Sequence, residues 1–167
     1  MVLETERLTM REMGRDDASN LLGIFEDPVA MRYYSSTKGR RETQEWISWN
    51  LRSYEEDGIG LWIVESKGSG RFLGECGLTM QEVEGVREPE VGYHFLREHW
   101  GQGFATEAAA ASLEYGFDSK GYDRIICLPA ADNLPSRRVA ERLGMAFERE
   151  VERHGQRVCV YAIERSR

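Results

Sequence analysis

The chain has 167 residues, of which 41% are hydrophobic and 31% are charged, and its formal net charge is −7. This length and composition predict one soluble globular domain over residues 1–167 and exclude a disordered chain. The acidic balance argues against nucleic acid as a partner and fits a cationic partner such as an amine, although it can also serve solubility alone.

The sequence carries no apolar run long enough to cross a bilayer, and its opening M-V-L-E-T-E-R-L has acids where a secretory leader would be apolar. We therefore expect a cytoplasmic protein with no membrane partner. The three cysteines lie far apart in apolar settings, which predicts buried thiols in a reducing compartment. They do not fall at metal-ligand spacings with the three histidines, so no metal site is expected.

The first elements expected along the chain are a strand and two helices, over residues 7–11, 17–25 and 39–57. The strand alternates apolar with polar side chains. Asp16 or Asp17 can cap the first helix, and Pro28 and Gly58 follow the two helix ends. Three strands should come next, over residues 60–65, 72–80 and 89–96.

The second half of the chain predicts a helix, a strand, a helix and two strands, over residues 104–119, 124–128, 135–143, 146–153 and 157–164. The turn H-G-Q can join the last two strands as a hairpin. The order of elements indicates an α+β fold, a mixed sheet with helices packed on it. Strand and helix do not alternate strictly, so a doubly wound nucleotide fold fits poorly.

The segment W-G-Q-G-F-A-T-E-A-A-A-A, at Trp100 to Ala111, has the composition of a phosphate-binding turn. Gly101 and Gly103 let backbone N–H groups approach an anion, and the following helix start adds unpaired N–H groups and a positive dipole end. The segment lacks the Lys-Ser or Lys-Thr of a P-loop and the third glycine of a dinucleotide fingerprint. Alternatively, the segment is only a tight turn, and its alanines allow the following helix to pack closely on a sheet.

This turn and the segment N-L-P-S-R-R-V-A-E-R-L-G-M, at Asn133 to Met145, together resemble the GNAT superfamily of acetyl-CoA-dependent N-acetyltransferases. The opening L-E-T-E-R-L-T-M-R, at Leu3 to Arg11, is similar to the RimJ/RimL-type branch, whose members acetylate ribosomal-protein N-termini. The resemblance covers nearly the whole chain. One departure is Trp100, where the family usually has Arg or Gln, although the RimJ/RimL-type branch tolerates Trp there.

The resemblance implies a single GNAT-like domain with a mostly antiparallel, splayed sheet of about seven strands and about four flanking helices. It implies transfer of an acetyl group from acetyl-CoA to a primary amine by direct attack in a ternary complex. The α-amine of a protein or peptide is the first expected acceptor. A small amine (polyamine, amino acid or antibiotic) and a non-catalytic acetyl-CoA sensor are alternatives, and a homodimer is possible.

The cofactor-binding residues implied by the resemblance lie in the turn, in the strand before it and in the later helix: Phe95, Leu96, Arg97, Gln102, Gly103, Phe104, Ala105, Thr106, Asn133, Ser136 and Arg138. Arg137 is a further candidate for the phosphates, although these arginines can equally be surface residues. Main-chain groups of residues 93–96 can hold the amides of the pantetheine arm if the sheet splays open, and Gly92 suits a bulge or close approach there.

The catalytic candidates implied are Ser136 and Glu90. Many relatives carry a Tyr seven residues after the Asn as acid for the departing thiolate, but this chain has Ala140 there. In the RimJ/RimL-type branch a Ser at the position of Ser136 serves instead, although Ser136 can also simply bond to the helix backbone. Asn133 can bind the cofactor arm, cap its helix, or do both.

The attacking amine must be neutral. At pH 7 this costs roughly 4.6 kcal/mol for a lysine side chain but only about 1.1 kcal/mol for an α-amine, so a weak base suffices for the latter. Glu90 is the first candidate and Glu75 the second, and either can instead be paired with a neighbouring cation. Five aromatic residues are candidates for the core or for the acceptor pocket: Tyr33, Tyr34, Trp46, Trp49 and Trp62.

Overall fold

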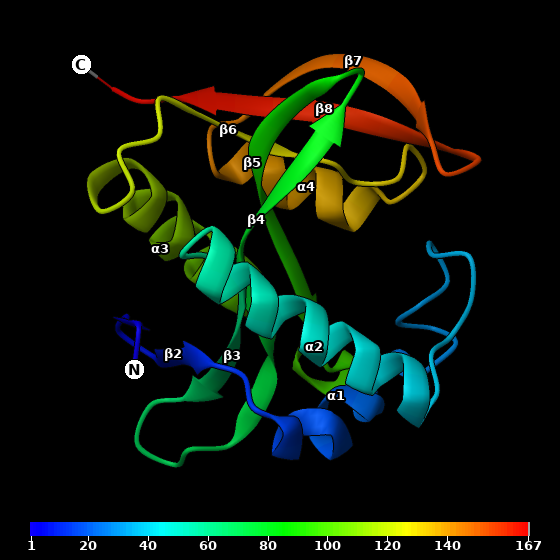
Figure 1. Cartoon of the computed structure of the whole chain (residues 1–167), viewed down its shortest axis with the longest axis vertical. Coiled ribbons are helices and arrows are strands. Elements are labelled where there is room, and N and C mark those ends of the chain that lie inside the picture. Colours follow the sequence, from blue (N-terminus) through cyan, green and yellow to red (C-terminus); the bar gives the residue numbers. More distant parts are fainter. Residues whose placement is uncertain (167) are drawn as a thin grey trace.

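An eight-stranded sheet organises the chain in a computed structural model, which describes residues 1–166 (Figure 1). The strands follow one another across the sheet in the order β1-β2-β3-β4-β5-β6-β8-β7. Their bounds are β1 Leu3–Glu4, β2 Leu8–Glu12, β3 Leu61–Ser66, β4 Phe72–Val83, β5 Val86–Phe95, β6 Arg124–Cys127, β7 Ala146–Arg153 and β8 Gln156–Glu164. The helices are α1 Ala18–Phe25, α2 Arg40–Glu56, α3 Phe104–Asp118 and α4 Leu134–Arg142, with short 3-10 turns at Arg15–Asp17 and Arg97–His99.

The α+β fold and the expected order of elements are confirmed, and most ends agree within a few residues. The two-residue strand β1 adds to the seven strands expected. Asp17 does stand at the start of α1, but its side chain does not cap that helix. The carboxylate instead accepts the N–H of Gly14 at 2.8 Å and pairs with Arg11 at 2.8 Å.

Two tight turns set the register of the long hairpins. Glu84 and Gly85 join β4 to β5, and His154 and Gly155 join β7 to β8. All four residues have positive φ, between 49° and 81°. Two consecutive residues of positive φ match the right-handed twist of the flanking strands. The H-G-Q hairpin predicted from the sequence is therefore present.

The sheet opens between β5 and β6. These strands run parallel and share a single ladder pair, Glu90 with Ile126, whereas every other neighbouring pair is antiparallel. β5 continues as far as Phe95 without β6 beside it. In Figure 1, β4 and β5 run steeply down the molecule while β8 runs across its top. One edge of the second half of β5 is therefore available to a ligand.

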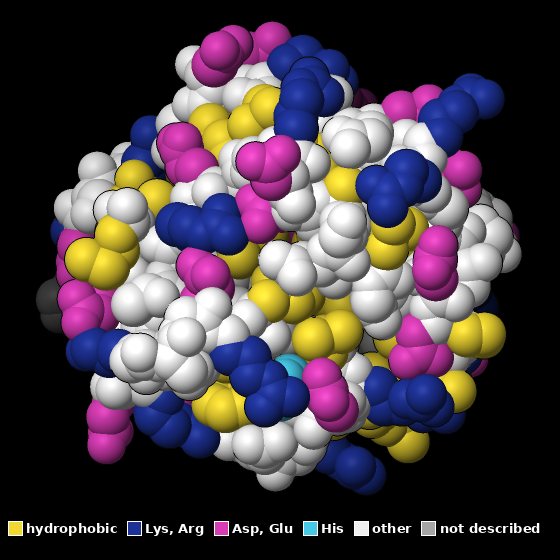
Figure 2. Space-filling model, turned by 90° about the horizontal axis from the view of Figure 1, so that it is seen from below, with side chains coloured by type: hydrophobic (Ala, Val, Ile, Leu, Met, Phe, Trp, Pro, Cys, Tyr) yellow, Lys and Arg dark blue, Asp and Glu magenta, His cyan; other side chains and the backbone are white. Residues whose placement is uncertain are grey.

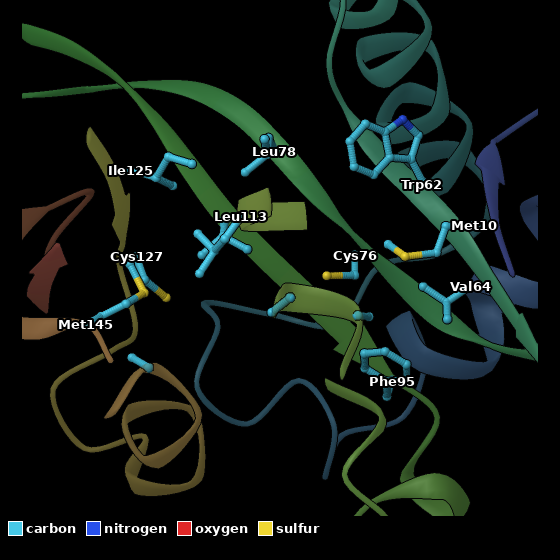
Figure 3. Close-up of a cluster of buried hydrophobic side chains, with 14 of the residues drawn as sticks. Met10, Trp62, Val64, Cys76, Leu78, Phe95, Leu113, Ile125, Cys127 and Met145 are labelled. Carbon is cyan, nitrogen blue, oxygen red and sulfur yellow. The ribbon is translucent and has the colours of Figure 1, made fainter. Parts of the chain in front are cut away.

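Helices cover both faces of the sheet. Figure 3 shows the larger apolar cluster, in which Trp62, Cys76 and Leu78 from the sheet meet Leu113 of α3 and Met145 after α4. Small residues of α3, fully buried at Ala108 and Ala109, allow this helix to lie close to the strands. On the opposite face, α1 and α2 pack on Leu61 and Ile63 of β3. The larger cluster includes Val91 and Phe95 of β5, so it packs against the strand beside the opening.

The surface mixes the two signs of charge. Figure 2 shows one face on which Lys and Arg side chains alternate with Asp and Glu, with apolar side chains between them. Within residues 1–166, no helix is both long and apolar enough to span a bilayer. The same residues contain no group of His, Cys, Asp and Glu arranged to hold a metal ion.

Candidate active site

The glycine turn before α3 has the geometry of an anion site. Gly101 and Gly103 adopt left-handed φ values of 77° and 81°, which side chains other than glycine rarely tolerate. α3 begins immediately afterwards at Phe104. Within the described chain, the N–H groups of residues 102–106 donate to no protein acceptor. The first N–H groups of the helix are therefore free for a ligand.

The opening segment of the chain holds this turn in place. Glu107 accepts hydrogen bonds from the Thr5 hydroxyl at 2.7 Å, the Arg7 backbone N–H at 2.9 Å and the Arg7 Nε at 2.7 Å. The Arg7 guanidinium also donates to the Gln102 carbonyl at 3.0 Å and stacks 4.5 Å from the ring centre of Phe104. Although burial opposes it, these bonds keep the pKa of Glu107 below its ordinary value. A negative charge close to the anion site is thereby neutralised.

A cleft of about 820 Å³ opens in front of the turn, and we call it the cofactor cleft. Its walls are the turn itself, the end of β5, the segment after α1 and one face of α4. Arg138 and Arg142 lie one helical turn apart on α4, and Arg32 lies on the segment after α1. The only acid in the lining is Glu107, which is already bound by Arg7. Although the protein as a whole is acidic, the charges that line this cleft therefore favour the binding of an anion.

Eight of the eleven predicted cofactor residues line this cleft: Phe95, Gly103, Phe104, Ala105, Thr106, Asn133, Ser136 and Arg138. Leu96, Arg97 and Gln102 are not part of its wall. Arg97 pairs with Asp27 at 3.2 Å, and the Gln102 side chain donates to the Glu98 carbonyl at 3.4 Å. Arg137 points elsewhere, donating to the Tyr161 hydroxyl at 3.0 Å and to the Ala131 carbonyl at 3.0 Å.

The start of α4 brings Asn133, Ser136 and Tyr93 together. The Asn133 side-chain oxygen accepts the Ser136 N–H at 3.2 Å, so Asn133 caps the helix and keeps its amide hydrogens free for other partners. The Tyr93 hydroxyl donates to the Ser136 carbonyl at 3.0 Å and lies 3.1 Å from the Ser136 hydroxyl. The Tyr93 phenol has only one proton, which it donates to the Ser136 carbonyl. In the contact between the two hydroxyl groups, Ser136 is therefore the donor and Tyr93 the acceptor.

The position at which many relatives carry a Tyr is occupied here by a core residue. Ala140 is fully buried in the main core and does not line the cleft. Burial raises the pKa of Tyr93 well above its ordinary value, so the phenol stays protonated at neutral pH. Ser136 and Tyr93 are therefore a pair of protonated hydroxyl groups in the wall of the cleft.

A second cavity of about 380 Å³ adjoins the first, and we call it the acceptor chamber. The two cavities share six residues at their junction: Tyr33, Tyr34, Tyr93, His94, Asn133 and Ser136. The predicted aromatic residues divide between two roles. Tyr33, Tyr34, Trp46 and Trp49 line the chamber, whereas Trp62 is 2% exposed and packs edge-on against Tyr115 in the core.

Glu90 faces the acceptor chamber from the single position at which β5 pairs with β6. Burial raises the pKa of Glu90 from its ordinary 4.5 to about 7, and the nearby Arg153 offsets part of this rise. A carboxyl group of that pKa can take a proton and release it at neutral pH. Glu90 is thus suited to act as a general base.

Glu75, the second candidate base, lies on β4 and is not part of the lining of the acceptor chamber. It is fully buried, and its two oxygens accept Trp46 Nε1 at 3.0 Å and contact His94 Nδ1 at 2.9 Å. The other ring nitrogen of His94 lies 2.7 Å from the Tyr34 hydroxyl at the junction of the cavities. Glu75 therefore orients His94 and Tyr34 and does not itself face the chamber.

Comparison with known proteins agrees with this geometry. The sequence profile of the family described as "Acetyltransferase (GNAT) domain" matches residues 7–146. The chain belongs to the GNAT acetyltransferase family. It is 41% identical to the uncharacterized protein YkkB of Bacillus subtilis (strain 168), over 95% of this chain and 93% of that protein. The GNAT fold and an acetyl-CoA-dependent acyltransferase activity are thus confirmed.

Two solved structures show the same fold. A GNAT-family acetyltransferase from Bacillus anthracis superposes with a TM-score of 0.83 and 25% identity, covering 98% of each chain. RimL, described as the ribosomal L7/L12 α-N-protein acetyltransferase in complex with coenzyme A, superposes with a TM-score of 0.79 and 16% identity. That comparison covers 98% of this chain and 97% of RimL.

Some features of this GNAT site were not predicted. Arg142 lies four residues after Arg138, and His94 four residues after Glu90, so helix and strand periodicity could have grouped each pair. The contact between Arg7 and Glu107 joins two recognised motifs, but only tertiary structure shows that they touch. At Gly92, where we expected a bulge or a close approach, β4 and β5 pair without a register shift.

Replacing Gly103 with Val should weaken binding of coenzyme A by about 10-fold or more, because a side chain at φ 81° strains the turn that presents the N–H groups. Isothermal titration calorimetry with coenzyme A measures the change. Gly85→Val is a matched control, since Gly85 has the same φ of 81° but lies in the β4–β5 turn. Wild-type affinity in Gly103→Val would contradict the proposed phosphate site.

Replacing Glu90 with Gln should lower kcat by about 100-fold, the scale of a lost general base. In the wild type, kcat/KM should rise as the pH passes about 7, because the carboxylate form accepts the proton. This rise should disappear in Glu90→Gln, while the titration of the amine itself remains. Thermal unfolding above pH 7 provides the control: removing a buried charge should leave the variant at least as stable. Identical pH profiles would exclude Glu90 as the base.

Proposed function

We propose that this GNAT protein transfers the acetyl group of acetyl-CoA to the α-amine of an acceptor held in the acceptor chamber. The observation that carries the proposal is the junction of the two cavities at Ser136 and Tyr93. A cationic cleft with free helix N–H groups meets there a chamber that holds a carboxyl group of raised pKa. The donor and the acceptor can thus meet without crossing the sheet.

The residues of the cofactor cleft fit coenzyme A. The N–H groups of residues 103–106 and the guanidinium groups of Arg138 and Arg142 would hold its phosphates. The unpaired edge of β5 would hold the amides of the pantetheine arm, as an added strand would be held. The free amide hydrogens of Asn133 would bind the same arm. The similarity to RimL, whose structure contains coenzyme A, supports this placement.

Two residues would manage the protons. The bound thioester supplies the acetyl group. The amine nitrogen bonds to the acetyl carbon, and the carbon–sulfur bond breaks. The amine loses one proton, and the departing thiolate gains one. Glu90 would take the proton of the amine, directly or through a water molecule. Ser136 would donate toward the sulfur by rotating its hydroxyl away from Tyr93, and solvent would restore its proton.

Two kinds of acceptor have support. The opening motif and the likeness to RimL favour the α-amine of a protein or peptide. The chamber itself favours a small amine, because Gln156 of β8 donates to the Tyr33 carbonyl at 2.6 Å and so links the two segments beside it. A panel of free-amine peptides and small amines, assayed by release of coenzyme A thiol, separates the two. Turnover of small amines alone would exclude the peptide acceptor.

Calorimetry with coenzyme A on the purified protein tests the shared basis of both candidates. Saturable binding of one coenzyme A per chain is expected, and it should be lost together with turnover when the phosphate turn is altered. Absence of binding would overturn the proposal for every acceptor.

Replacing Ser136 with Ala should lower kcat by about 100-fold while the affinity for coenzyme A stays close to that of the wild type. Coenzyme A affinity is preserved because Asn133 still accepts the backbone N–H of residue 136. Steady-state kinetics and calorimetry check the two halves of this prediction. An unchanged kcat would assign Ser136 a purely structural role at the helix start.

A further inference from the structure

Two opposite charges face the acceptor chamber from different strands. Glu90 projects from β5, and Arg153 lies at the end of β7. Within residues 1–166 they form no ion pair within 4.0 Å. Arg153 donates through one nitrogen to Gln81 Oε1 at 2.9 Å. Because Gln81 is neutral, this hydrogen bond does not neutralise the positive charge of Arg153. The chamber therefore offers one site for a cation and a separate site for an anion.

Apolar side chains form another part of the chamber lining. Trp46 and Trp49 of α2 are stacked with ring centres 5.7 Å apart and an interplanar angle of 29°. The hydrogen bond from Trp46 Nε1 to Glu75 fixes this surface. Leu61, Val91 and Val158 add further apolar side chains to the lining. Such a wall suits an apolar or aromatic group of the acceptor.

The chamber is limited in size and in access. Its volume of about 380 Å³ holds one small molecule. The Gln156–Tyr33 hydrogen bond ties the β7–β8 hairpin to the segment between α1 and α2. A peptide bond in place of a carboxylate would leave Arg153 without a counter-charge.

We propose that the acceptor is a free α-amino acid with an apolar or aromatic side chain, whose carboxylate binds Arg153 while its amino group faces Glu90. This inference rests on the proposed N-acetyltransferase function and names the acceptor within it. The side chain of the amino acid lies against Trp46 and Trp49. The amino nitrogen then points toward the junction at Ser136, where the acetyl group is delivered.

Three related compounds test the carboxylate site: phenylalanine, phenylalaninamide and 2-phenylethylamine, which share the aromatic group and the amine. Acetyl transfer from acetyl-CoA should be about 10-fold or more efficient, in kcat/KM, for phenylalanine than for the other two, because they leave Arg153 unpaired. In Arg153→Gln, the ratio of kcat/KM for phenylalanine to kcat/KM for 2-phenylethylamine should fall by about 10-fold, because a change in the pKa of Glu90 affects both compounds alike. Arg149→Gln is the matched control, since Arg149 lies on the same strand, binds Glu84 and Glu148, and does not line the chamber.

The outcomes distinguish failure of the amino-acid acceptor from failure of the proposed N-acetyltransferase function. Equal rates for the three compounds, or turnover only of a peptide that begins with phenylalanine, would overturn the amino-acid acceptor and leave acetyl transfer intact. The protein could also bind coenzyme A and acetylate none of the three compounds or the peptide. In that case, calorimetry measures whether phenylalanine binds to the protein–coenzyme A complex, and the absence of such binding overturns the inference. Failure to bind coenzyme A would refute the proposed function itself.

Discussion

The separation of β5 from β6 after Glu90 is the constraint on which the site depends. A parallel strand pair normally continues for several residues, but here it stops after one ladder pair. A longer β6 partner would occupy the edge of β5 and the space of both cavities. The opening is tolerable because β4 pairs with β5 along its whole length, and two apolar clusters hold the strands from either face. The site is therefore a consequence of how the sheet is left incomplete.

Charge is distributed unevenly within an acidic protein. The net charge of −7 would repel a polyphosphate if it were spread evenly, but the cofactor cleft presents arginines and one acid that Arg7 neutralises. The acceptor chamber instead keeps a carboxyl group and a guanidinium apart. The two halves of the site thus differ in the ligand charge that they favour, which in the proposed reaction would place the donor and the acceptor on either side of the junction at Ser136.

The sequence allowed the elements and the anion turn to be predicted, because glycines, caps and hydrophobic periodicity act locally. Asn133 as a helix cap and the glycine turn before the helix that begins at Phe104 follow from such local rules. The role of Glu75 could not be predicted, because it depends on the register that places His94 beside it across two strands. The Arg153 position depends on the closing hairpin, which brings the end of the chain back over β5.

The contact between Arg7 and Glu107 joins residues 100 positions apart. The glycine turn is therefore not a self-contained loop, because the first strands contact it and α3 directly and support its shape. Occupancy of the turn and docking of that opening segment must then favour each other to the same extent, by thermodynamic reciprocity. Bound coenzyme A would make the beginning of the chain one of its most protected parts against hydrogen exchange, although chain ends generally fray.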